Sequence, residues 1–206
     1  MTILQSLDDE LAAISSSGKT PRLLLHCCCA PCASYALEYL SPYFSITVLY
    51  YNPNIQPREE YYKRADEFPG LLARAAYPNS VDLSVSDHDP AAFDAATLLL
   101  RDEPEGGRRC AVCFELRLRQ AAEHAKQGGY DYFATTLSVS PHKNAALLNE
   151  IGARLADELG VRYLESDFKK RDGYKRSVEL SKLYGLYRQT YCGCLPSLAN
   201  DAPRVV

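Results

Sequence analysis

Eight cysteines gathered in three short segments constrain this 206-residue chain more than any other feature of its sequence. The segments are Cys27 to Cys32, Cys110 to Cys113 and Cys192 to Cys194. Disulfide frameworks belong to exported proteins, but residues 1–20 contain acidic side chains where a signal peptide has a basic region followed by an apolar one. An isolated cysteine is commonly a small buried apolar residue, whereas tight groups in a cytoplasmic protein indicate metal or redox chemistry. The sequence therefore predicts a cytoplasmic protein with metal or redox sites.

Short apolar segments alternate with helical patterns along the whole chain. Such alternation indicates a parallel sheet with right-handed crossovers and helices on both faces. The sequence therefore predicts an α/β fold, a single Rossmann-like domain over 1–206 with a mainly parallel five-stranded sheet. The expected strands are residues 22–26, 46–51, 81–85, 130–135 and 161–164.

Helical periodicity between these segments completes the pattern. An N-terminal helix and linker are expected over 1–20, and residues 195–206 are expected to form a mobile tail. Pro69 and Gly70 predict a break in the helix expected at residues 59–75, and Gly160 predicts the end of the helix expected at residues 144–159. The later helices are expected at residues 32–40, 59–75, 90–100, 110–126 and 144–159.

Ligands of such folds bind beyond the carboxyl ends of the strands, where the strand order reverses. Three segments are expected to leave the sheet at that edge: the first cysteine group, residues 136–144 and residues 166–173. The first strand-to-helix turn, which carries a glycine-rich fingerprint in nucleotide-binding folds, holds cysteines here. We therefore expect the active site at this edge.

The spacing of the cysteines lets several sulfurs reach one partner. Cys110 and Cys113 are three residues apart, which places both sulfurs on one face of a helix start. The positive end of the helix dipole, with Arg108 and Arg109, favours the thiolate form of these two side chains. The first group also lies at a helix start, and Gly193 lets the Cys-Gly-Cys backbone turn both sulfurs to one side.

Spacing alone leaves the identity of the metal open, since four thiolates satisfy tetrahedral zinc as readily as a 4Fe-4S cluster. Zinc would be structural, yet a complete α/β pattern of this size does not need a metal to fold. Eight thiols also exceed one zinc site. A redox role is the simpler interpretation, with some cysteines on a cluster and a second set on another metal or acting as a dithiol.

The charge pattern limits the possible partners. A net charge of -3 argues against the broad basic surface of a non-specific nucleic-acid binder, and no segment approaches the ~18 apolar residues of a membrane span. Residues 169–176 nevertheless place five cations beside Tyr174 at the expected active edge. Such a run suits phosphate contacts and base stacking on RNA, although a charge run is more often a solvated face.

Six sequence strings, spread from residue 24 to residue 194, resemble the QueH family of epoxyqueuosine reductases. This resemblance implies reductive deoxygenation of epoxyqueuosine in the tRNA anticodon to queuosine, without cobalamin. It also implies a 4Fe-4S cluster, with an additional mononuclear iron as an option, an adenine-nucleotide-hydrolase-like (HUP) topology, and as partners the tRNA anticodon stem-loop and an electron donor of unknown identity. The strings are LLHCCCAPCASY, YYNPNIQPREEY, DEPEGGRRCAVCFELRL, YFATTLSVSPHKN, SDFKKRDGYKRS and YGLYRQTYCGC.

The family pattern in the first loop is a vicinal cysteine pair followed by Ala-Pro-Cys, which leaves Cys27 as a packing residue. Two partitions of the other seven cysteines are open. The preferred one makes Cys192 and Cys194 a redox dithiol, keeps Cys32 as a further catalytic cysteine, and gives the cluster to Cys28, Cys29, Cys110 and Cys113. The alternative leaves the first loop to a second iron and gives the cluster to Cys110, Cys113, Cys192 and Cys194.

Converting an epoxide to an alkene consumes two electrons and two protons, while a 4Fe-4S cluster passes one electron at a time, so a second redox or Lewis-acid partner is needed. His142 and Lys143 are candidates for the acid or a substrate anchor, and Asp167 for an acid or a metal neighbour. His142 is equally compatible with a surface role. The expected substrate-binding residues are Lys143, Asn144, Lys169, Lys170, Lys175 and Arg176. A zinc-stabilised RNA-binding module and a thiol oxidoreductase without a cluster remain alternative functions.

Overall fold

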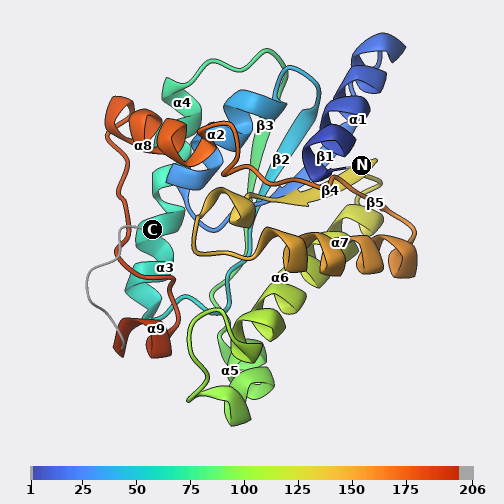
Figure 1. Ribbon diagram of the computed structural model, residues 1–206. Coiled ribbons are helices and arrows are strands. Elements are labelled where there is room, and N and C mark those ends of the chain that lie inside the picture. The colour runs from blue at the N-terminus through green and yellow to red at the C-terminus, as the bar shows by residue number, and fades with distance from the viewer. Residues whose placement is uncertain (1, 200–206) are drawn as a thin grey trace.

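The computed structural model describes residues 2–199, which form one five-stranded sheet with every strand parallel to its neighbours (Figure 1). The order β3-β2-β1-β4-β5 is consistent with the predicted Rossmann-like, HUP-type α/β fold. The fold class is therefore confirmed, with a sheet that is wholly rather than mainly parallel. The strands are β1 Arg22–His26, β2 Ser45–Tyr50, β3 Val81–Val85, β4 Tyr132–Thr135 and β5 Arg162–Tyr163.

The helices cover both faces of the sheet, with α2 and α4 on one side and α6 and α7 on the other (Figure 1). The short helix α9 occupies the start of the segment expected to be a tail, and residues 200–206 lie outside the described residues. The helices are α1 Ile3–Ser17, α2 Ala30–Leu40, α3 Arg58–Ala65, α4 Glu67–Arg74, α5 Ala91–Thr97, α6 Arg108–Gln127, α7 Ala145–Leu159, α8 Gly173–Leu183 and α9 Leu195–Ala199, with 3₁₀ turns η1 Leu98–Leu100 and η2 Thr136–Val139.

Strand β1 explains why the first apolar run is continuous. Successive side chains of a strand point to opposite faces, so Leu23 and Leu25 enter one core and Leu24 enters the other. The first core lies between the sheet and α1, α2 and α4, and the second lies under α6 and α7. A strand that is buried on both faces has no polar positions to alternate with apolar ones.

Capping residues mark the start of α1 and both ends of α7. Thr2 and Gln5 form a capping box at the start of α1, while Asn144 caps α7 and Gly160 ends it in the left-handed conformation. The predicted break at Pro69 and Gly70 is wrong, because the chain bends at Asp66. Pro69 lies in the first turn of α4, where a missing N–H leaves no hydrogen bond unmade.

The strand order reverses between β1 and β4, since the next strands along the sheet, β2 and β5, lie on opposite sides of this pair. The segments that follow β1 and β4 therefore meet in the crevice where such folds bind ligands. Among residues 2–199, no helix combines the length and apolar character that crossing a membrane requires.

Candidate metal centre

Seven cysteines converge at the carboxyl edge of the sheet in two groups. The sulfurs of Cys28, Cys29 and Cys32 all lie within 4.8 Å of one another. A separate small cavity is lined by Cys110, Cys113, Cys192 and Cys194. Cys192 also lines a second cavity with Cys28 and Cys32, so this residue connects the two groups. The first cysteine group lies at the edge where it was expected, and the other two cysteine segments join it there.

The turn from β1 into α2 builds the three-sulfur group. Cys29 caps α2 with extended backbone, and Pro31 lies in the first turn, which brings Cys28 and Cys32 to the same side. Hydrogen bonds from the neighbouring Cys29 and Cys32 thiols hold the pKa of Cys28 well below its usual value. The same hydrogen bond raises the pKa of Cys29 to about 12, and the pKa of Cys32 is also raised by Cys28. The hydrogen bonds among the three thiols thus favour a thiolate within this group.

The first turns of α6 contribute two sulfurs to the four-cysteine cavity. Burial raises the pKa of Cys110 and raises that of Cys113 to about 12. The expectation that Arg108 and Arg109 favour thiolates here is therefore wrong. Arg108 binds the carboxylate of Glu103, and Arg109 donates to backbone carbonyls of the preceding loop, so neither charge outweighs the burial.

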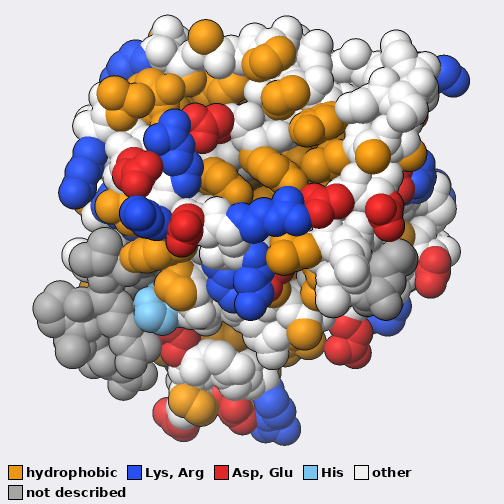
Figure 2. Space-filling model, turned by 45° about the horizontal axis from the view of Figure 1, so that its top comes forward, with side chains coloured by type: hydrophobic (Ala, Val, Ile, Leu, Met, Phe, Trp, Pro, Cys, Tyr) orange, Lys and Arg blue, Asp and Glu red, His pale blue; other side chains and the backbone are white. Residues whose placement is uncertain are grey.

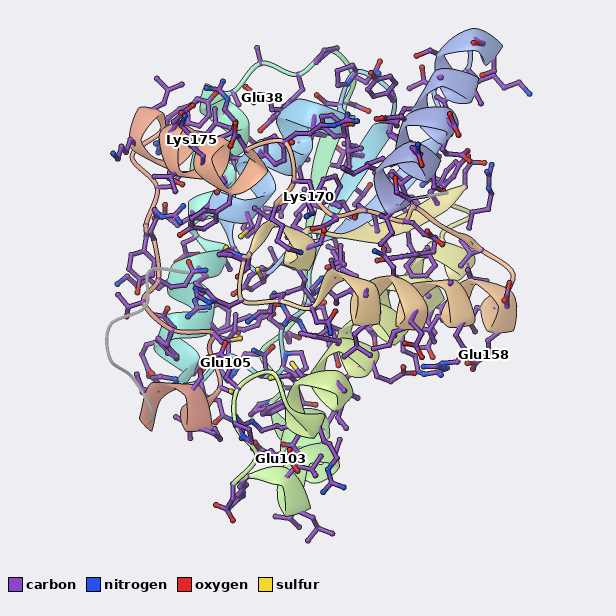
Figure 3. The ribbon with its side chains drawn as sticks, in the orientation of Figure 1. Glu38, Glu103, Glu105, Glu158, Lys170 and Lys175 are labelled. Atoms are coloured by element: carbon purple, nitrogen blue, oxygen red, sulfur yellow. The ribbon has the colours of Figure 1, made fainter. Side chains whose placement is uncertain are left out.

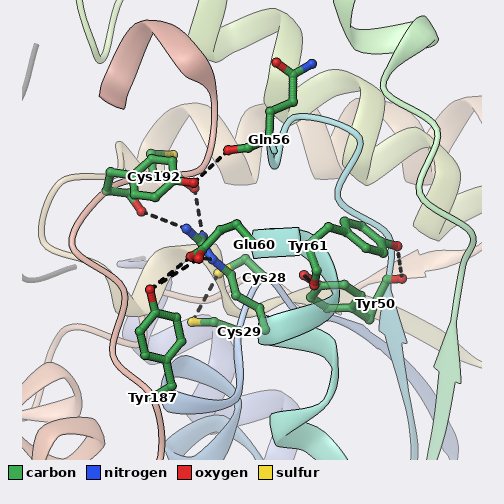
Figure 4. Close-up of polar contacts among 10 residues, drawn as sticks. Cys28, Cys29, Tyr50, Gln56, Glu60, Tyr61, Tyr187 and Cys192 are labelled. Carbon is green, nitrogen blue, oxygen red and sulfur yellow. Dashed lines mark hydrogen bonds and ion pairs between the residues drawn. The ribbon is translucent and has the colours of Figure 1, made fainter. Parts of the chain in front are cut away.

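The Cys-Gly-Cys segment is held by buried hydrogen bonds to α3 and the loop before it (Figure 4). Arg64 donates to the carbonyl oxygens of Tyr191 and Cys192, each at 3.2 Å, and forms an ion pair with Glu60 at 2.7 Å. Tyr191 donates its hydroxyl to the Gln56 carbonyl at 2.7 Å.

Gly193 is required in this segment for two reasons. Its φ of 125° lies in a region that side chains disfavour, and a Cβ atom there would stand 2.8 Å from Ile55 Cγ1. The Gly193 carbonyl also accepts a hydrogen bond from the Gln56 N–H at 2.8 Å. The glycine thus brings the Cys192–Cys194 backbone directly against the loop that follows β2.

Lys143 is buried beside the cysteines rather than part of an exposed surface. Its ammonium is buried, 3.0 Å from Cys192 Sγ and 3.3 Å from a carboxylate oxygen of Glu105. Figure 3 places Glu105 in the loop that precedes α6. Burial by itself lowers the pKa of Lys143, but the charges of Cys192 and Glu105 outweigh burial and raise it above its usual value.

The other predicted acid and anchor residues lie outside these cavities. His142 is exposed, and its backbone N–H donates to the Ser140 hydroxyl. Asn144 accepts a hydrogen bond from the Leu147 N–H as the cap of α7. Asp167 forms an ion pair with Lys169 at 2.6 Å.

The basic run 169–176 leads into helix α8, which the sequence did not predict. Arg171 pairs with Asp8, and Arg176 pairs with Glu38 and Glu179. Lys170 and Lys175 are exposed, and both are labelled in Figure 3. Figure 2 shows Lys and Arg side chains interleaved with Asp and Glu side chains on the face that it presents. The run is therefore a mixed-charge surface with a few exposed lysines.

Buried polar atoms beside the four cysteines indicate that a group with hydrogen-bond acceptors fits there. Both polar atoms of the Asn54 side chain are buried without a partner among the described residues, and so are Nε and Nη2 of Arg109. Asn54 and Arg109 line the same cavity as the four sulfurs. Four thiols and unpaired N–H donors match the needs of a thiolate-bound cluster whose sulfides accept hydrogen bonds.

Three buried side chains at this edge were missed by the sequence reasoning: Arg64, Asn54 and Arg117. Arg117 lines the cavity with Cys28 and Cys192. Arg117 lies four residues after Cys113, and residues at that spacing share a helix face. This spacing was the one signal in the sequence that Arg117 lies beside the cysteines.

The protein combines a parallel α/β fold with two clusters of cysteines at the point where the strand order reverses. These features define a cysteine-rich, Rossmann-like protein of the metal-binding or redox class. The family model described as "Epoxyqueuosine reductase QueH" matches residues 23–200, and the chain belongs to this family.

Curated relatives agree with the family model. The chain is 44% identical over 177 residues to an epoxyqueuosine reductase QueH of Streptococcus pyogenes, covering 85% of this chain and 69% of the relative. Identity to the protein of that name from Staphylococcus epidermidis is 44% over 184 residues, covering 86% and 76%. For the Thermotoga maritima protein it is 35% over 184 residues, covering 85% and 90%.

Proposed function

We propose that the chain is an epoxyqueuosine reductase, which removes the epoxide oxygen of epoxyqueuosine in a tRNA anticodon and yields queuosine. The observation that carries this proposal is the convergence of seven cysteines at the switch-point crevice of a QueH family member. The reaction consumes two electrons and two protons and releases water. A tRNA substrate also implies a cytoplasmic location.

The geometry favours the second of the two cysteine partitions. Cys192 and Cys194 line one cavity together with Cys110 and Cys113, which supports a 4Fe-4S cluster on these four residues. Cys28, Cys29 and Cys32 form a compact set of their own, which supports a separate iron. Such groups supply one-electron transfer and Lewis acidity, respectively. A Cys192–Cys194 dithiol would instead leave Cys110 and Cys113 without the two thiols that line the same cavity.

The small hollow between the two groups has room for about one water molecule, and it marks the place that the reacting end of the modified base is proposed to approach. It is lined by Cys28, Cys32, Arg117, Leu137, Ser140, Lys143, Gln189 and Cys192. Lys143 is the proposed proton donor or anchor at this cavity, since its ammonium is the charged N–H donor beside Cys192. The Gln189 Oε1 atom is buried without a partner among the described residues, so it can accept a hydrogen bond from a polar group of the substrate.

Contact with the anticodon stem-loop is proposed to use few charges. Lys170 and Lys175 are the exposed candidates for phosphate contacts, because Lys169 and Arg176 already pair with carboxylates. Asn144 caps helix α7, so it is not proposed to contact the substrate. The electron donor is proposed to be a separate reductant.

Metal analysis of single cysteine variants tests the cofactor assignment. Protein purified without oxygen is expected to be coloured and to contain iron and acid-labile sulfide. Cys194→Ala is expected to lose most of the sulfide, whereas Cys29→Ala is expected to keep it and lose a smaller part of the iron. A colourless protein loaded with zinc would reject the iron-sulfur assignment. Retained sulfide in Cys194→Ala would favour the first partition.

A further inference from the structure

Arg117 is a buried cation without a carboxylate partner. Its side chain is 1% exposed, and no ion pair to an aspartate or glutamate is formed by it within residues 2–199. The buried guanidinium of Arg64, by contrast, binds Glu60. Taking a charge out of water costs several kcal/mol unless an opposite charge lies beside it. The environment of Arg117 should therefore contain another source of negative charge.

The groups around the guanidinium are neutral side chains and thiols. Nη2 donates to Asn52 Oδ1 at 2.5 Å, Nε lies 3.4 Å from His26 Nε2, and Nη1 lies 3.9 Å from Cys113 Sγ. His26 cannot supply a negative charge, because an imidazole is either neutral or positive; its ring is buried between Thr135 and the Tyr51 carbonyl. The cysteines are the remaining source of negative charge.

Arg117 contacts both cysteine groups. It lines the cavity with Cys28 and Cys192, and it reaches Cys113, which lines the four-cysteine cavity. Lys143, the other buried cation at this cavity, already has the carboxylate of Glu105. The guanidinium thus lies between the two cysteine groups, where the thiolates that form on metal binding would balance its charge.

We propose that Arg117 is a positioning residue whose guanidinium balances the thiolates of both cysteine groups and raises the reduction potential of the cluster. This inference rests on the cofactor of the proposed function. A nearby positive charge stabilises the reduced cluster, which carries one more negative charge than the oxidised form, and low solvent access keeps this effect unscreened. Because the same guanidinium lies beside the proposed iron group, it also favours metal binding there.

The first test measures the cluster directly. Iron-loaded Arg117→Gln and Arg117→Lys proteins are titrated with a reductant, and the reduced cluster is followed by electron paramagnetic resonance. The neutral Gln variant is expected to show at least a tenfold lower ratio of reduced to oxidised cluster at a given potential, equivalent to a fall of about 59 mV for one electron. The Lys variant keeps the charge and is expected to fall less.

Arg119→Gln is the matched control, because Arg119 lies on the same helix but pairs with Glu115 and Glu158 at the surface. Its potential is expected to equal that of the unchanged protein. An Arg117→Gln protein with a full complement of iron and an unchanged potential would overturn the proposal.

A second test needs neither iron nor tRNA. Zinc added to the reduced apoprotein requires the same thiolates, so the rise in melting temperature on zinc addition is expected to be smaller in Arg117→Gln than in Arg119→Gln. The melting temperature with zinc is compared with that of the same variant without zinc. A loss of stability from altered packing therefore cancels. An equal rise in both variants contradicts the inference. Failure of the unchanged protein to deoxygenate epoxyqueuosine would reject the proposed function while leaving this zinc result intact.

Discussion

Replacing Arg64 with methionine tests whether a buried guanidinium holds the Cys-Gly-Cys segment in place. Arg64 is 1% exposed and donates to Glu60 and to the carbonyls of Tyr191 and Cys192. Methionine fills much of the same volume but leaves the carboxylate and both carbonyls without these donors. Removing one partner of a buried ion pair costs about 3–5 kcal/mol of unfolding free energy.

For a chain of this size, 1 kcal/mol shifts the melting temperature by about 2–4 °C, so the expected fall is about 6–20 °C. Calorimetry of the reduced apoprotein measures it. The control is Arg119→Met, whose arginine has the same i,i+4 spacing from Glu115 but lies at the surface. Arg119 makes two such exposed pairs, with Glu115 and Glu158, and each contributes about 0.2–1 kcal/mol, so the control is expected to melt no more than about 8 °C below the unchanged protein.

A double variant, Glu60→Gln with Arg64→Met, separates the ion pair from packing. Removing both charges is expected to cost less than the sum of the single changes, because neither variant residue then leaves a buried charge unpaired. The reasoning is refuted if Arg64→Met and Arg119→Met have the same melting temperature. It is also refuted if the double variant loses as much stability as the Glu60→Gln and Arg64→Met variants added together.

Three further substitutions have expected outcomes at other positions. Cys27→Ala should keep all iron and lose about 1 kcal/mol in urea unfolding, because the Cys27 side chain is fully buried in the apolar core; loss of iron would instead make it a ligand. Gly193→Ala should lower zinc affinity about 5- to 150-fold by calorimetric titration, since strain of about 1–3 kcal/mol falls on the Cys192–Cys194 turn; unchanged affinity would show that the turn adapts. Lys143→Met should lower the single-turnover rate at least tenfold while His142→Ala leaves it within about twofold, and the reverse order would move the proton donor to His142.

The sheet and the cysteine edge followed from simple patterns in the chain. Leu23 to Leu25 are apolar on both faces of one strand, and Asn144 and Gly160 bound one amphipathic helix, so local sequence and tertiary packing agree. Helix α8 was missed because cations dominate its first turn and the residues before it, and their partners Glu38 and Asp8 come from distant segments.

The supporting residues of the site were harder to predict than its cysteines. Arg64 and Arg117 occupy helices, where arginine is usually solvated. The spacing of Arg117 from Cys113 is the one sign in the sequence that it lies at the site, and nothing in the sequence indicates that either arginine is buried. The partner of Arg64 at Cys192 lies 128 residues further along the chain, so only the packed structure joins them. Lys143 was predicted as a substrate anchor, yet its burial beside Cys192 depends on how the loops after β4 and before α9 meet.

The central claim is the reductive deoxygenation of epoxyqueuosine at the two cysteine groups. The most direct measurement incubates iron-loaded protein without oxygen with a chemical reductant and tRNA that carries epoxyqueuosine, and then analyses the nucleosides by mass spectrometry. We predict conversion to queuosine by the unchanged protein and by Cys27→Ala, and none by Cys194→Ala or Cys29→Ala. Epoxyqueuosine that stays intact with the fully iron-loaded, unchanged protein would contradict the claim.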